Sequence, residues 1–170
     1  MSETALTVSA RHTHGRLLAR LADALCDADF SRAIALTGML LGALSGLAMG
    51  LWSFGGPLPE PDWIGGYSEL PRRLLRLGHI ALFALGMINL MLVRQLAGSA
   101  LRERTARLAV AAMNTGNILM PALLFAAVFQ PGIKYLLGLP ALAVSLALGV
   151  AAFAAWRQWR LRRAPMDLRR

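Results

Sequence analysis

The chain has 170 residues, of which 56% are hydrophobic and only 16% are charged. When its 16 glycines are included, about 65% of the residues are apolar, whereas about 45–50% is usual for soluble domains. This composition excludes a disordered chain and an ordinary soluble domain, and it indicates an integral membrane protein. The one cysteine, Cys26, excludes an intrachain disulfide and a cysteine-based metal site.

The net charge of +9 comes from 18 basic residues, all of them arginines except Lys134. In a soluble protein such a charge would suggest nucleic-acid binding. Here the arginines form short clusters between long apolar runs, which is typical of membrane topology signals. We therefore expect the lipid bilayer, and no nucleic acid, to face these charges.

Four apolar runs are long enough to cross a bilayer. About 20 helical residues at 1.5 Å each span a hydrocarbon core of about 30 Å. Because lipid cannot hydrogen-bond the backbone, such runs must be helical. The sequence predicts an all-α, up-and-down bundle of four transmembrane helices within a membrane domain of residues 33–156. The predicted spans are residues 33–54, 74–93, 108–129 and 135–156.

The two sides of the predicted bundle differ strongly in charge. Fourteen basic residues lie in the N-terminal segment, the loop between the second and third spans and the C-terminal tail, whereas four lie on the opposite side. Short loops rich in arginine stay in the cytoplasm. We therefore predict a multi-pass protein of the inner (plasma) membrane with both termini cytoplasmic.

The segments outside the spans have patterns of their own. Residues 1–32 form a cytoplasmic arm with a predicted amphipathic helix from His14 to Phe30, whose leucines and charged residues occupy different faces. This helix lies on the membrane surface, against a partner or on its own bundle, and the sequence leaves these three placements open. Residues 157–170 form a basic tail beside Trp156, a residue type that anchors helices at the membrane interface.

Small residues recur every four positions in the first and fourth spans. Such stripes allow two helix backbones to approach closely in lipid. We expect them to serve helix packing within the bundle, and a seam between two copies or a groove for a pigment or lipid tail is the alternative. The residues are Gly38, Gly42, Gly46 and Gly50 in the first span, and Ala141, Ser145 and Gly149 in the fourth.

His79 is the one histidine within a predicted span, and ionisable residues at that depth are functional candidates. Gly86, seven residues later, falls on nearly the same helix face and would leave room for a flat macrocycle. Arg72, Arg73 and Arg76 lie where they could pair with propionates. These residues suggest a cofactor site for haem b, with His79 as the iron ligand, or for a quinone. A hydrogen-bonded structural histidine is the alternative.

Three asparagines lie within the second and third spans. Asn89 and Asn114 fall at similar depths of an antiparallel helix pair, so we expect them to meet. Asn117 lies near the membrane centre, and Pro121 has no N–H to give to the Asn117 carbonyl. We expect a locally polar stretch that lines a cavity, with plain interhelical hydrogen bonding as the alternative.

Reactive groups are scarce in this sequence. No carboxylate lies within a predicted span, which argues against a carboxylate-based proton relay, and no known catalytic motif is present. We predict a non-catalytic accessory or cofactor-holding subunit of a membrane assembly, with other membrane subunits or a second copy as its partners. Two other functions stay open: a redox module that uses His79, and a carrier or channel for a small solute along the asparagines.

Overall fold

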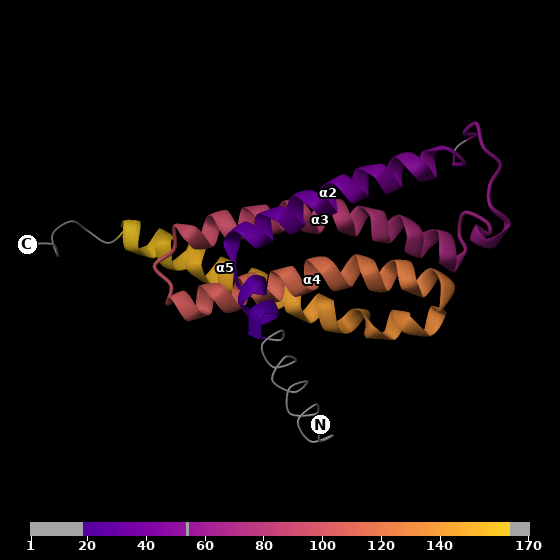
Figure 1. Cartoon of the computed structure of the whole chain (residues 1–170). Helices are drawn as coiled ribbons and strands as arrows, with labels where there is room; N and C mark the ends of the chain where they lie inside the picture. Colours follow the sequence, from indigo (N-terminus) through magenta and orange to yellow (C-terminus); the bar gives the residue numbers. More distant parts are fainter. Residues whose placement is uncertain (1–18, 54, 164–170) are drawn as a thin grey trace, which may run out of the picture.

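The structure is a computed structural model that describes residues 19–53 and 55–163 (Figure 1). Within these residues all regular secondary structure is helical and no strand is present, which confirms the predicted fold class. Each of its four long helices is apolar and long enough to cross a membrane. They are α2 (Ala28–Gly50), α3 (Leu70–Ala97), α4 (Glu103–Phe129) and α5 (Gly138–Arg163).

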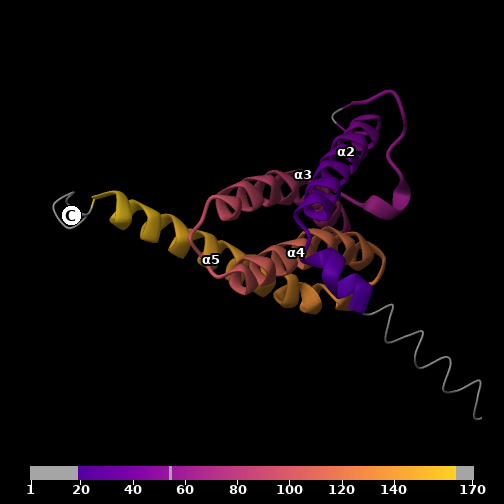
Figure 2. The same cartoon turned by 60° about the vertical axis from the view of Figure 1, so that its left-hand side comes forward.

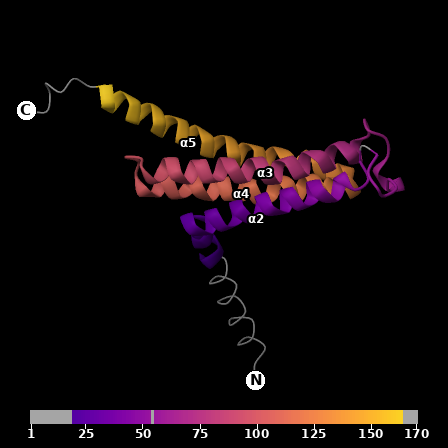
Figure 3. The same cartoon turned by 90° about the horizontal axis from the view of Figure 1, so that it is seen from above.

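The four helices run alternately up and down, as predicted. The α2–α3 and α4–α5 connections lie at one end of the bundle, and the α3–α4 loop lies at the other (Figure 1). Seen from above, α3 and α4 lie between α2 on one side and α5 on the other (Figure 3). α4 is the most buried of the four, whereas most of α5 is exposed and its C-terminal end extends beyond the other helices (Figure 2).

The predicted helix of the N-terminal arm is interrupted. Residues 19–25 are helical, but the chain turns at Cys26 and Asp27, and α2 begins at Ala28. Asp27 causes this break because its carboxylate accepts the backbone N–H of Phe30 at 2.7 Å and caps α2. One continuous helix from His14 to Phe30 is therefore wrong. The part before residue 19 lies outside the described residues.

The connections at the α2–α3 end are partly helical, and the one between α2 and α3 comprises residues 51–69. A 3₁₀ turn, η1 (Asp62–Ile64), places the Ile64 side chain in the interior with no exposed surface. The Trp63 ring lies 5.5 Å from the ring of Phe129 at the end of α4. A second 3₁₀ segment, η2 (Pro131–Leu137), leads directly into α5.

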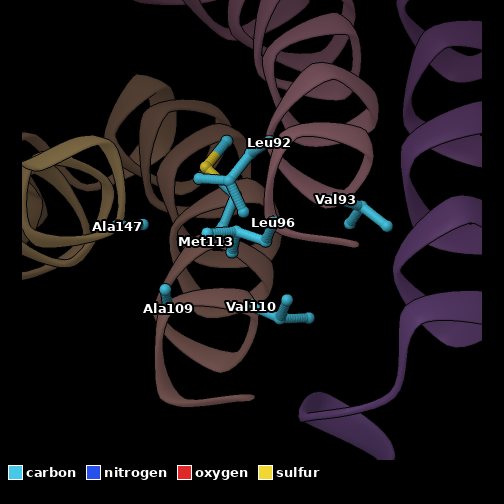
Figure 4. Packing of buried hydrophobic residues seen from close by; sticks show 7 residues of the cluster. All are labelled: Leu92, Val93, Leu96, Ala109, Val110, Met113 and Ala147. Carbon is cyan, nitrogen blue, oxygen red and sulfur yellow. The ribbon is translucent and has the colours of Figure 1, made fainter. Parts of the chain in front are cut away.

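The apolar interior consists of two clusters along α3 and α4. The larger cluster joins α3, α4 and α5, with Met113 and Ala147 fully buried (Figure 4). In this view Val93 and Val110 lie on the side facing α2. The smaller cluster, nearer the α2–α3 loop, comprises Leu74, Leu124, Ala127 and Val128.

Candidate functional site

α2 packs against α3 through glycines. A Cβ added at Gly42 would lie 3.0 Å from the backbone nitrogen of Phe83, and one added at Gly38 would lie 3.3 Å from the carbonyl oxygen of Leu82. At Gly50 an added Cβ would meet nothing within 4 Å of the described chain. The two backbones therefore approach closely along Gly38 and Gly42, as small residues permit, and they separate towards the loop.

The small residues of α5 do not face the rest of the described chain. Ala141 and Ser145 are exposed, and a Cβ added at Gly149 would meet nothing within 4 Å. α5 instead packs through a different face, on which Pro140, Ala147 and Ala154 are buried. All faces of α5 are apolar in its membrane part, so the sequence pattern could not indicate which one turns inward.

Asn89 and Asn114 meet between α3 and α4, and Ser31 of α2 joins them. The three side chains have no exposed surface. Asn89 Nδ2 donates to Asn114 Oδ1 at 2.9 Å. The Ser31 hydroxyl lies 2.7 Å from Asn89 Oδ1 and 2.9 Å from Asn114 Oδ1, and it donates its one proton to either of them. This Ser31–Asn89–Asn114 cluster links three helices.

The same cluster also fixes the N-terminal segment. Asn114 Nδ2 donates to the carbonyl oxygen of Leu25 at 2.9 Å. Nearby, the exposed pair of Arg107 and Asp23 lies at 3.4 Å. Residues 19–25 therefore lie against α4 of their own bundle, at an angle to α2 (Figure 1). Of the three placements that the sequence left open, the described part of the arm adopts this one.

Asn117 lies one turn further along α4 and has a different environment. It is 4% exposed, and its Nδ2 is buried without a hydrogen-bond partner among the described residues. Its Oδ1 would be 3.9 Å from a Cβ added at Gly38, so the amide points towards α2. Pro121, four residues later, has no N–H for the Asn117 carbonyl, although α4 continues through it.

The Asn117 amide lines a groove between α2 and α4 with a volume of about 570 Å³. We call this the Asn117 groove. Its walls are almost entirely apolar, and its two polar groups besides Asn117 are the hydroxyls of Thr37 and Ser45. The Ser45 hydroxyl is already bonded to the Gly42 carbonyl at 3.0 Å. The walls of the Asn117 groove include Thr37, Gly38 and Ser45 of α2, and Asn117, Pro121 and Phe125 of α4.

His79 lies on α3 and faces α2. Its Nδ1 is 2.9 Å from the Arg76 carbonyl oxygen, and because a carbonyl only accepts, Nδ1 carries the proton. In the neutral ring Nε2 then holds the lone pair. A Cβ added at Gly46 would lie 3.5 Å from Nε2, so α2 passes close to this nitrogen. A smaller cavity of about 260 Å³ lies beside the ring.

The arginines near His79 already have partners. Arg72 forms an ion pair with Glu60 of the α2–α3 loop. Arg76 stacks on the Tyr67 ring at 4.0 Å and donates to the Tyr67 carbonyl at 3.1 Å. Arg73 is exposed. Two of the three arginines thus hold the loop against α3 rather than facing a free anion.

Gly86 does not leave the open face that the sequence suggested. A Cβ added there would lie 2.7 Å from the Ala35 carbonyl oxygen and 2.7 Å from Met39 Cγ. The space beside Gly86 is therefore filled by α2. With Gly46 in front of His79, the residues present do not fit a macrocycle between α2 and α3. No group of three or more metal-ligating side chains occurs among residues 19–53 and 55–163.

Sequence reasoning missed Ser31, which lies two residues before the predicted first span. Ser31 occupies the same face as the buried Ala35, Gly38 and Gly42, at helical spacings of four, three and four. Extending the glycine stripe backwards along α2 would have found it. Sequence reasoning also missed Gly116, where an added Cβ would clash with Val144 of α5.

No protein-family model, curated protein or solved structure matches this chain.

Proposed function

We propose that this integral membrane protein is a non-catalytic subunit that holds one lipid-soluble molecule in the Asn117 groove. The observation that carries the proposal is the buried Asn117 Nδ2, which has no partner among the described residues and lies at the wall of an apolar groove. The molecule would place its apolar body between α2 and α4 and one carbonyl oxygen at Asn117. A quinone or a lipid ester has this chemistry.

The unpaired amide supports a ligand because burying it alone is costly. A buried donor without a partner costs about 1–3 kcal/mol, and within a bilayer no water is at hand to satisfy it. A ligand carbonyl would recover this free energy. Asn114 on the same helix has a hydrogen-bond partner on both its Oδ1 and its Nδ2, so the fold is able to pair an amide near this depth.

The size and lining of the groove support the same proposal. Small-molecule sites are usually apolar cavities of about 300–1,000 Å³ with a few polar groups, and the groove has about 570 Å³. Because its α2 and α4 walls are parts of spanning helices, it would open to the lipid. None of its lining residues is a histidine, cysteine or methionine, so it offers no axial ligand to haem iron.

A channel along the asparagines is less well supported. Asn89 and Asn114 are fully buried and bonded to each other and to Ser31. A path for a solute needs polar groups that face open space. The Ser31–Asn89–Asn114 cluster instead joins the helices where such a path would pass.

The proposed subunit lies in the inner membrane with both termini in the cytoplasm and packs with other membrane subunits or a second copy. The charge difference between the two sides of the bundle supports this orientation. Reporter fusions at Ala100 and at the C-terminus should report the cytoplasm, and a fusion at Asp62 should report the outside. A cytoplasmic signal at Asp62 would reverse the orientation.

The ligand is tested by extraction of the purified protein. Protein purified in a mild detergent is extracted with organic solvent, and the extract is quantified by mass spectrometry. We expect about one small molecule per chain in the wild type and a loss of at least about tenfold in Asn117→Leu, because a hydrogen bond to a buried polar group is removed.

Thr115→Val is the matched control for this experiment. Thr115 also lies on α4, but its hydroxyl donates to the Ala111 carbonyl of its own helix at 2.9 Å and does not line the groove. It should retain the molecule at the wild-type level. Equal retention in the wild type, Asn117→Leu and Thr115→Val would contradict the proposal.

Haem ligation by His79 is tested separately by absorption spectroscopy. Because α2 fills the space at Gly86 and passes close to His79 at Gly46, we expect no Soret band in protein produced with ample haem, and no change in His79→Ala. A Soret band that His79→Ala abolishes would instead establish the redox module.

A further inference from the structure

A further cavity lies at the opposite end of the bundle from the α2–α3 loop. It is formed where α3 ends and the exposed end of α5 passes it, and its volume is about 540 Å³. Unlike the Asn117 groove, it is rich in polar groups. Its walls are Met91, Arg94, Gln95 and Gly98 of the α3 end and Gln158 and Arg162 of α5. We call it the Arg94–Arg162 pocket.

The frame of this pocket is fixed by hydrogen bonds. Gln158 Nε2 donates to the Gly98 carbonyl at 2.6 Å, and Gln95 Nε2 donates to Gln158 Oε1 at 3.3 Å. Arg157 Nη1 donates to the Ala100 carbonyl at 2.7 Å and ties α5 to the α3–α4 loop. The two helices are thus held at a set separation, with Arg94 and Arg162 at the walls.

The two arginines bring uncompensated positive charge. Neither Arg94 nor Arg162 forms an ion pair within the part of the chain that the structure describes. The described carboxylates at this end are those of Asp23, Asp27, Asp29 and Glu103, and none of them lines the pocket. Asp23 is paired with Arg107, Asp29 is paired with Arg32, and Asp27 caps α2. Two arginines that line one pocket without a carboxylate favour a phosphate, which guanidinium groups bind by charge-assisted hydrogen bonds.

The position of the pocket indicates the rest of the ligand. Trp156 and Trp159 lie on the same part of α5, and indole rings mark the membrane–water interface. On the membrane side the pocket is bounded by Met91, which is 68% exposed and would face lipid. A ligand with a phosphate at the arginines therefore has its remaining part directed along apolar surface.

We propose that the Arg94–Arg162 pocket binds the phosphate headgroup of an anionic phospholipid. Basic pockets between transmembrane helices are suited to anionic headgroups. The arginines would hold the phosphate, the free N–H of Gln95 would donate to a headgroup oxygen, and the acyl chains would lie along Met91. This site is separate from the Asn117 groove and does not depend on the function proposed there.

The test is lipid binding by the full chain in a neutral detergent, in which no charged membrane surface attracts the arginines. Native mass spectrometry records binding during titration with phosphatidylglycerol or phosphatidylcholine. We expect the wild type to bind one phosphatidylglycerol molecule in preference to phosphatidylcholine. Arg94→Gln and Arg162→Gln should each lower the affinity for phosphatidylglycerol at least about tenfold, and the double variant should combine the two losses, because each substitution removes a hydrogen bond to a charged group.

The matched control is Arg104→Gln with Arg160→Gln, which removes the same charge at the same end of the bundle outside the pocket. It should bind phosphatidylglycerol like the wild type. Arg94 and Arg162 are exposed, so their variants should unfold like the wild type. If the double variant Arg94→Gln with Arg162→Gln does not fold, the titration is made with Arg162→Gln alone.

Three results would overturn the proposal. The first is equal binding of phosphatidylglycerol and phosphatidylcholine, and the second is an equal loss of affinity in the pocket variants and in their control. The third is displacement of the lipid by inorganic phosphate at equal concentration, which would show a site for the free ion rather than for a lipid. Persistence of the bound lipid in the presence of inorganic phosphate supports the lipid headgroup.

Discussion

Asn114 and Asn117 lie three residues apart on α4, and both are buried, yet their surroundings are opposite. Asn114 accepts from Asn89 and Ser31 and donates to the Leu25 carbonyl. Asn117 has an Nδ2 without a partner among the described residues and lies at an apolar groove. One helix therefore carries two kinds of buried asparagine: Asn114 joins three helices, whereas the Nδ2 of Asn117 bonds to none of the described residues.

This difference shows that burial alone does not identify a binding residue in a membrane protein. Burial with complete hydrogen bonding indicates a structural role, since the side chain has nothing left to offer a ligand. Burial without a partner indicates a place where a ligand would restore the missing bond. The substitutions below test this distinction, and they run from the largest expected effect to the smallest.

Asn114→Leu should cause the largest loss of stability. It removes one partner each from Ser31, Asn89 and Leu25, and at about 0.6–1.7 kcal/mol for each interhelical bond the free energy of unfolding should fall by about 2–5 kcal/mol. Unfolding in mixed micelles, followed by circular dichroism, measures it. A loss as small as that of an exposed substitution would mean that the cluster is not structural.

Gly42→Ala should weaken the same cluster from a distance. The added Cβ would lie 3.0 Å from the backbone of Phe83, so α2 must move away from α3 and Ser31 must move away from Asn89. We expect a loss of about 1–3 kcal/mol, which is usual for overpacking. Gly50→Ala is the control, because nothing lies within 4 Å of its added Cβ in the described chain. It should be neutral or slightly stabilising.

Asn117→Leu should have the opposite sign in ligand-free protein. It removes an unpaired buried amide, whose burial costs about 1–3 kcal/mol, and the groove has room for the new side chain. The free energy of unfolding after delipidation should therefore rise by about 1 kcal/mol or more, measured in the same mixed micelles. A loss comparable to that of Asn114→Leu would show that Asn117 has a structural partner after all.

Ser31→Ala should have a smaller effect than Asn114→Leu, because Asn89 and Asn114 remain bonded to each other. We expect a loss of about 1 kcal/mol in the free energy of unfolding. Ser45→Ala on the same helix is the control, since its hydroxyl donates only to the Gly42 carbonyl of α2. Equal effects of the two substitutions would show that the interhelical bond of Ser31 adds nothing.

The four helices and the meeting of Asn89 with Asn114 could be predicted from the sequence. Long apolar runs must be helical in lipid, and short loops make consecutive helices antiparallel, which brings residues at equal depth together. The break at Asp27 could not be predicted from the leucine pattern. The break depends on a helix cap, in which the Asp27 carboxylate accepts the N–H of Phe30. The leucine pattern continues through Asp27 and does not indicate that a helix begins there.

The candidate functional site was less predictable from the sequence, because it depends on which face of each helix is covered by which neighbouring helix. Helical spacing places His79 and Gly86 on one face of α3, but it cannot show that α2 covers that face at Gly46 and Ala35. For the same reason it cannot show that Asn117 faces a groove while Asn114 faces Ser31. The hydrophobic pattern of α5 has no polar side in the membrane, so its packing face follows only from the contacts of the folded chain.

Nuclear magnetic resonance of the asparagine side chains tests the distinction between Asn114 and Asn117 most directly. The chain has only three asparagines, all in α3 and α4, so selective labelling with ¹⁵N-asparagine yields three side-chain amide signals, assigned by single substitution to Leu. The spectrum is recorded before and after removal of bound lipid-soluble molecules. We predict that the Asn117 amide signal shifts, whereas those of Asn89 and Asn114 stay in place. Three unchanged signals, or a shift confined to Asn89 and Asn114, would contradict the assignment of Asn117 to a ligand.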